Sequence, residues 1–165
     1  MADLLTHVLV PYVVLTVANW WIDVADRWIP VAMGGAAIPD LVKLDVLLDD
    51  ATIERVLGLP FSWEPISSLG GVLVVAAAIA VLFDHSERRR AYAWLVFGGL
   101  SALVLDALRA FADGRASFWL FPIWWRPPTP NLYVSSDPRV LASALALAGT
   151  VSIVDFVRRR RDEEG

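Results

Sequence analysis

The side chains that could perform chemistry in this 165-residue chain are few, because it contains two histidines and no cysteine. The lack of cysteine excludes a disulfide, a thiolate nucleophile and a cysteine-based zinc site. His7, Asp40 and Asp106 are of the types that bind a divalent metal such as zinc, if three segments bring them to one point. Asp106 also precedes Arg109 by one helical turn, and spacing alone favours this simple ion pair over a metal site.

The segments that must position these residues are apolar blocks of membrane-spanning length. Hydrophobic residues make up 57% of the chain and charged residues 19%, and the mean hydropathy is +0.56, which is too apolar for a soluble domain of this size. We therefore predict an all-α fold, a single polytopic transmembrane helix bundle with about five spans of roughly 20 residues each. The spans are expected at residues 4–22, 28–48, 66–83, 91–112 and 140–157.

The second block is irregular, because Gly34-Gly35 and Pro39-Asp40 interrupt it and Lys43 adds a charge. Polar or irregular backbone at membrane depth must be buried in protein or line a wet cavity. Residues 28–48 therefore either cross the membrane facing their neighbours or form a re-entrant segment. Residues 49–64 are expected to form an amphipathic or looping connection.

The orientation of the bundle is predicted from its basic clusters. Short loops rich in Arg stay in the cytoplasm, and such clusters occur at Arg88–Arg90 and Arg158–Arg161, separated by two spans. The N-terminus is then outside, and its first residues lack the basic start and cleavage site of a secretory signal, so the first block is expected to be retained. The C-terminus is cytoplasmic, in a multi-pass protein of the cell membrane.

This topology places the ionisable residues of the spans toward the outer surface, where the loop 113–139 also lies. Arg109, or Arg126 in that loop, would hold a phosphate there. The aromatic run Trp119–Trp125 is typical of an interfacial belt, and a lid over a cavity is the alternative. Membrane lipids are the expected partners. Nucleic acid is excluded because no basic face is interleaved with exposed aromatic residues, and the sequence identifies no protein partner.

Four short motifs in a fixed order add a family resemblance. They are Thr6-His7, Ala37-Ile38-Pro39-Asp40, Gly98-Gly99-Leu100-Ser101-Ala102-Leu103-Val104-Leu105-Asp106 and Phe121-Pro122-Ile123-Trp124-Trp125. In this order the chain resembles the YdjM-like membrane-bound metal-dependent hydrolases, and it looks closest to archaeal members from halophiles. The resemblance implies that His7, Asp40 and Asp106 stand at ligand positions. It also implies relatives that are distantly similar to zinc-dependent phospholipase C.

The chain departs from the family pattern at several ligand positions. Ala102 stands where the family has a histidine after Leu-Ser, Val42 replaces the second aspartate of Pro-Asp-x-Asp, and no histidine occurs near Ser67-Ser68. One histidine and two aspartates hold at most one divalent metal, or none.

Three functions therefore remain open. The first is hydrolysis of a phosphoester or lipid-like substrate at the outer membrane face, with metal-activated water. The second is a non-catalytic membrane protein that binds lipid head groups or partners through a degenerate site. The third is a small transporter in which Gly34–Asp45 is a discontinuous helix, although the chain shows no internal repeat.

Overall fold

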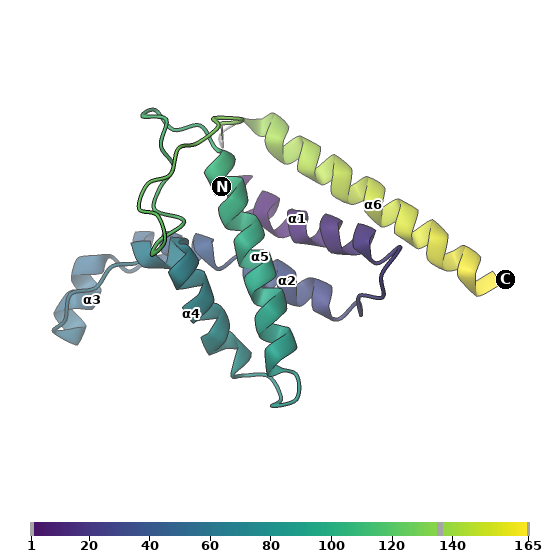
Figure 1. Cartoon of the computed structure of the whole chain (residues 1–165), viewed down its shortest axis with the longest axis horizontal. Coiled ribbons are helices and arrows are strands. Elements are labelled where there is room, and N and C mark those ends of the chain that lie inside the picture. Colours follow the sequence, from purple (N-terminus) through teal and green to yellow (C-terminus); the bar gives the residue numbers. More distant parts are fainter. Residues whose placement is uncertain (1, 135–136, 165) are drawn as a thin grey trace.

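The computed structural model describes residues 2–134 and 137–164, and these residues form six α-helices and two 3₁₀ helices with no strand. The predicted all-α fold is thus confirmed for the described part of the chain. In chain order the elements are α1 (Ala2–Ala18), α2 (Trp28–Ala36), η1 (Pro39–Val46), α3 (Asp50–Leu57), η2 (Glu64–Ser67), α4 (Leu69–Ala80), α5 (Arg88–Leu108) and α6 (Pro138–Glu164) (Figure 1).

Two helices in the described residues are long and apolar enough to cross a membrane, namely α5 and the part of α6 from Pro138 to Arg161. The apolar helical segments Leu4–Ala18 and Leu69–Ala80 are shorter than this length. The prediction of about five spans is therefore supported only in part. Of the apolar window in α6, 11% is buried within the chain, so the apolar side chains of this helix face outward along most of its length.

The second apolar block is not one helix, which corrects the range 28–48 as a continuous span. Helix α2 ends at Ala36, and the chain tightens into 3₁₀ geometry from Pro39 to Val46. Proline is favoured at the first turn of a helix because it has no backbone N–H to leave unpaired there. Pro39 therefore starts a new element, and Asp40 lies in its first turn.

Helices α2 and α5 approach each other closely where both carry glycine. A Cβ on Gly35 would lie 2.1 Å from the carbonyl oxygen of Leu95, and one on Gly98 would lie 1.8 Å from that of Ala32. Small residues allow such contact between backbones, as in helix pairs in membranes. Gly99, the next residue, faces Val72 of α4, whereas Gly98 faces α2.

Helix α6 packs along α1 in the same direction (Figure 1). Tyr12 and Ser152 are joined through their hydroxyl groups at 2.8 Å, and the indole N–H of Trp20 donates to Asp155 at 3.2 Å. These contacts hold a helix that has few other neighbours.

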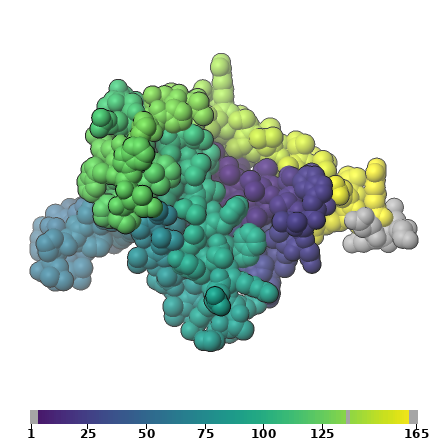
Figure 2. Space-filling model, in the orientation of Figure 1, coloured from purple at the N-terminus to yellow at the C-terminus, as the bar shows by residue number. Residues whose placement is uncertain are grey.

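Ion pairs join two loops and the C-terminal part of α6 at one end of the helices. Arg27, after α1, pairs with Glu87, before α5, at 2.7 Å. Asp26 accepts from Arg159 at 2.5 and 3.0 Å, and this interaction holds the pKa of Asp26 below its usual range. The loop at 109–134 lies beyond the C-terminal end of α5, and α3 projects sideways from the bundle (Figure 2). Both Arg clusters are thus at one end of the bundle.

Candidate functional site

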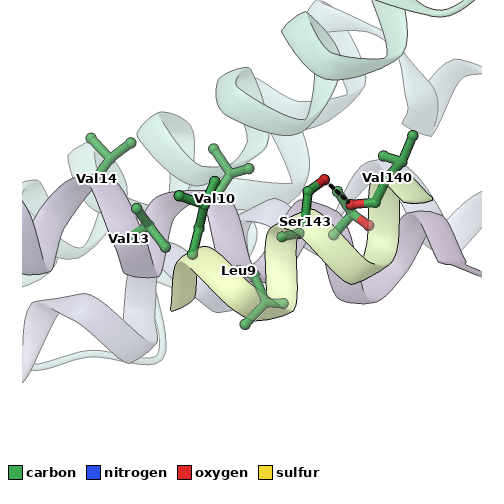
Figure 3. Close-up of a pocket in the computed structure, with 9 residues that line it drawn as sticks. Leu9, Val10, Val13, Val14, Val140 and Ser143 are labelled. Carbon is green, nitrogen blue, oxygen red and sulfur yellow. Dashed lines mark hydrogen bonds between the residues drawn. The ribbon is translucent and has the colours of Figure 1, made fainter. Parts of the chain in front are cut away.

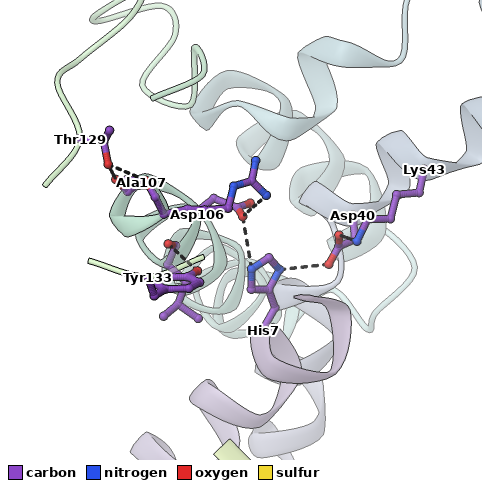
Figure 4. A network of polar contacts seen from close by, with 9 residues as sticks. His7, Asp40, Lys43, Asp106, Ala107, Thr129 and Tyr133 are labelled. Carbon is purple, nitrogen blue, oxygen red and sulfur yellow. Dashed lines mark hydrogen bonds and ion pairs between the residues drawn. The ribbon is translucent and has the colours of Figure 1, made fainter. Parts of the chain in front are cut away.

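His7 lies between two carboxylates that come from different elements (Figure 4). Its Nδ1 is 3.0 Å from Oδ2 of Asp40 in η1, and its Nε2 is 3.5 Å from Oδ1 of Asp106 in α5. The His7 side chain is 2% exposed. The structure therefore brings together the three residues that the sequence placed at one depth. An imidazole donates to both carboxylates only when it carries a hydrogen on each nitrogen.

Cations accompany each carboxylate of this cluster. Lys43 pairs with Asp40 one turn later in η1, and Arg109 lies with its Nη1 3.7 Å from Oδ1 of Asp106. The Asp106–Arg109 pair expected from spacing is thus present. The result is a chain of alternating charges from Lys43 through His7 to Arg109.

The loop that follows α5 fixes the end of this helix. The last carbonyl groups of a helix have no partner within it and must be satisfied from outside. Here the hydroxyl of Tyr133 donates to Leu105 at 2.9 Å, the N–H of Leu132 donates to Leu108 at 2.9 Å, and the hydroxyl of Thr129 lies 2.8 Å from the oxygen of Ala107. Asp106 and Arg109 are therefore held on a satisfied helix end and not on a frayed one.

The same loop covers the start of α4. Trp119 accepts from the N–H of Leu69 at 2.7 Å, and Phe121 accepts from that of Gly70 at 3.0 Å. Ser68 caps the helix by accepting from the N–H of Gly71 at 3.2 Å. Ser68 is thus the N-cap of α4.

A pocket of about 350 Å³ adjoins the charged cluster. Its lining contains three carboxylates and two cations, which are Asp40, Glu64, Asp106, Lys43 and Arg109. Ser67, Ser117 and Phe118 form much of the remaining wall. Trp125, which is 65% exposed, stacks on Phe118 with the ring centres 6.0 Å apart. One tryptophan of the aromatic run thus packs on a residue that lines the pocket. Sequence reasoning missed Glu64 and Ser117 as lining residues, because no spacing signal linked them to His7, whereas Ser67 begins a predicted span at the same outer depth as His7.

Arg126 does not line this pocket. It pairs with Asp113 inside the loop. The backbone N–H of Arg115 and, next, the Arg126 guanidinium hold the pKa of Asp113 below its usual range. Of the two arginines predicted to hold a phosphate, Arg109 is the one at the pocket.

The donor set does not fit a catalytic zinc ion. Zinc in hydrolases takes three protein ligands and keeps a position for water. No group of three or more histidine, aspartate or glutamate side chains placed to hold a metal occurs among residues 2–134 and 137–164. Asp40 meets His7 on the nitrogen opposite Asp106, which is where an orienting carboxylate stands and not a second ligand of the same ion.

An apolar groove of about 300 Å³ lies between α1 and α6 (Figure 3). Its walls include Val10, Val13 and Val14 of α1 with Val140 and Leu147 of α6. The groove is mainly apolar, and no charged side chain lines it.

Comparison with known proteins gives no relative. No family model, no curated protein and no solved structure matches the chain.

Proposed function

We propose that the chain is a multi-pass membrane protein that binds a zwitterionic phospholipid head group in the pocket beside His7, without hydrolysing it. In this proposal the apolar helices cross the membrane, the N-terminus is outside and the C-terminus is cytoplasmic. The pocket then faces the outer surface, in keeping with the positions of the Arg clusters at the opposite end.

The observation that carries this proposal is the mixed charge of the pocket. Arg109 and Lys43 supply cations for a phosphate, and Arg binds phosphate through two parallel hydrogen bonds. Glu64 lies on the same pocket and forms no ion pair with any described residue, so it offers a carboxylate for an ammonium group. A head group with one phosphate and one ammonium matches this arrangement better than an anion alone does.

Two exposed tryptophans of the loop that supplies Ser117 and Phe118 to the pocket support the same occupant. Trp124 and Trp125 are 54% and 65% exposed, and tryptophan is enriched at the level of lipid head groups. A small soluble ligand in the pocket would leave these two side chains exposed to water. A lipid surface would cover them.

The buried position of His7 explains why the bound lipid is not hydrolysed in this proposal. His7 faces a carboxylate on each nitrogen and is itself almost fully buried, so it is not presented to the pocket as a base. Its role in this proposal is to join α1 to η1 and α5 and so to fix Asp40 and Asp106 at the pocket wall.

The proposal is tested by titrating the full chain in detergent with phosphatidylethanolamine and counting bound lipid by native mass spectrometry. Arg109→Gln should weaken binding about tenfold or more, because a hydrogen bond to a charged group contributes about 1.5–3 kcal/mol. Arg126→Gln is the matched control, since it removes an equal charge from the adjoining loop and should leave binding within about twofold. Equal loss in both variants, or none in Arg109→Gln, would contradict the proposal.

A second candidate is the metal-dependent hydrolase that the family resemblance implies. One observation favours it: Nε2 of His7 and Oδ1 of Asp106 are 3.5 Å apart, close enough to bind one metal ion together, although the described residues supply no third ligand of the kind that a hydrolytic zinc ion takes. Metal analysis of purified protein, with His7→Ala as control, separates the two functions. Stoichiometric zinc that is lost in His7→Ala would favour the hydrolase.

A further inference from the structure

A second pocket lies at the other end of the molecule, between α4 and the start of α5. It measures about 270 Å³ and is lined by Ala77, Ala80 and Val81 of α4 and by Arg88, Arg89 and Tyr92 of α5. It belongs to the end of the bundle where the ion pairs gather the loops. It is therefore remote in the fold from the cluster around His7.

The wall of this pocket that α4 provides is small and apolar. Alanine at 77 and 80 leaves space that a larger side chain would fill, and Ala77 is exposed while Ala80 belongs to the buried core. An open apolar slot at the outer surface of a helix pair is suited to a hydrocarbon chain.

The wall that α5 provides carries charge at its edge. Arg88 and Arg89 begin the helix, and Tyr92 follows them at the spacings that share one helix face. The Nε of Arg88 donates to the carbonyl of Phe83 at 3.1 Å, which anchors its stem over the end of α4 and leaves the terminal nitrogens for a ligand. Long basic side chains cover apolar surface with their stems while their charged heads stay in water.

We propose that this pocket binds one anionic phospholipid at the cytoplasmic surface, with its phosphate at Arg88 and Arg89 and part of an acyl chain along Ala77 and Val81. Basic pockets between membrane helices at the cytoplasmic side recognise anionic head groups in this way. The nearby Glu87 is neutralised by Arg27, so it does not oppose a phosphate, and Asp84 remains as the one exposed carboxylate of the turn. This inference rests on the membrane topology proposed above, but not on lipid binding in the pocket beside His7.

The sequence offers a matched control for the charge. Arg90 is exposed and adjacent to Arg89, but it does not line the pocket. Native mass spectrometry should show one phosphatidylglycerol bound to the full chain. The double variant Arg88→Gln, Arg89→Gln should bind this lipid at least about tenfold more weakly than the unchanged chain does. Binding by Arg90→Gln should stay within about twofold of the unchanged chain. Equal weakening in Arg90→Gln would mean diffuse attraction to a basic loop and would overturn the proposed site.

A second pair of variants tests the apolar part without altering any charge. Ala77→Leu fills the pocket, whereas Ala78→Leu adds the same bulk at an exposed position of α4 that does not line it. Ala77→Leu should reduce phosphatidylglycerol binding about fivefold or more, and Ala78→Leu should not. Equal binding by both variants would contradict a seated acyl chain.

Two further probes separate a lipid from its charge alone. Phosphatidylcholine should bind at least about tenfold more weakly than phosphatidylglycerol, because its ammonium group opposes the arginines. Inorganic phosphate at an equal concentration should displace none of the lipid, since it cannot occupy the apolar slot. Equal binding of phosphatidylcholine, or full displacement by inorganic phosphate, would overturn the proposal.

Discussion

Replacing Gly98 by alanine should force α2 and α5 apart. The new Cβ would lie 1.8 Å from the carbonyl oxygen of Ala32 and 2.8 Å from the backbone nitrogen of Ala36. Carbon and oxygen atoms in close contact are about 3.3 Å apart or more, so the helices must separate by roughly 1.5 Å. Both obstructing atoms are backbone, so no side chain can rotate to relieve the contact.

The magnitude follows from two opposing effects. Overpacking costs about 1–3 kcal/mol, and contact with rigid backbone places this site at the upper end. Alanine is favoured over glycine within a helix by about 1 kcal/mol. The net loss is then about 2 kcal/mol, which corresponds to a fall in Tm of about 4–8 °C for a chain of this size.

The assay is thermal unfolding of the full chain in detergent, followed by circular dichroism. Gly34→Ala is the matched control, because Gly34 lies in α2 and a Cβ there meets nothing within 4 Å. We expect the Tm of Gly34→Ala to be equal to or slightly above that of the unchanged chain. A Gly98→Ala variant as stable as Gly34→Ala would refute the close approach of α2 and α5.

Three more outcomes are expected. His7→Ala should lower the free energy of unfolding by about 1–3 kcal/mol, because it leaves two carboxylates without their shared partner, whereas the exposed His85→Ala should not; equal Tm values would contradict the cluster. The pKa of Asp26 is lowered in the folded chain, so its ion pair with Arg159 stabilises the fold above about pH 4. This stabilisation is lost as the pH falls through the lowered pKa, and it amounts to less than about 1 kcal/mol because the pair is exposed. Asp26→Asn should remove this part of the pH dependence between pH 6 and pH 3, and an unchanged profile would exclude the pair as its source. Reporter fusions after Arg90 and Arg161 should indicate the cytoplasm and one near Pro130 the outside, and opposite signals at the first two would refute the topology.

The meeting of His7, Asp40 and Asp106 could be predicted from sequence because the expected topology places the ends of the apolar blocks at one depth. Once the Arg clusters set the direction of each block, charged residues at block ends fall on one side. Depth alone does not fix rotation of a helix about its axis. The sequence therefore could not show that Asp40 and Asp106 meet opposite nitrogens of one imidazole, which the structure supplies.

The second apolar block was the least predictable part of the fold. A hydropathy average over residues 28–48 does not indicate that Pro39 starts a separate 3₁₀ helix within the block. The partner of Gly98 was also beyond the sequence, because a small residue indicates a close contact but not which helix makes it. The wall formed by Glu64 and Ser67 depends on how η2 folds against η1, which is a tertiary contact without a local pattern.

The most direct test of lipid binding beside His7 is solid-state NMR of the full chain in phosphatidylethanolamine bilayers. With all arginines labelled with ¹⁵N, dephasing by lipid ³¹P reports which guanidinium groups touch a phosphate. We expect part of this signal to disappear in Arg109→Gln and to persist in Arg126→Gln. If the dephasing is the same in Arg109→Gln as in the unchanged chain, Arg109 holds no head group and the proposed function is wrong.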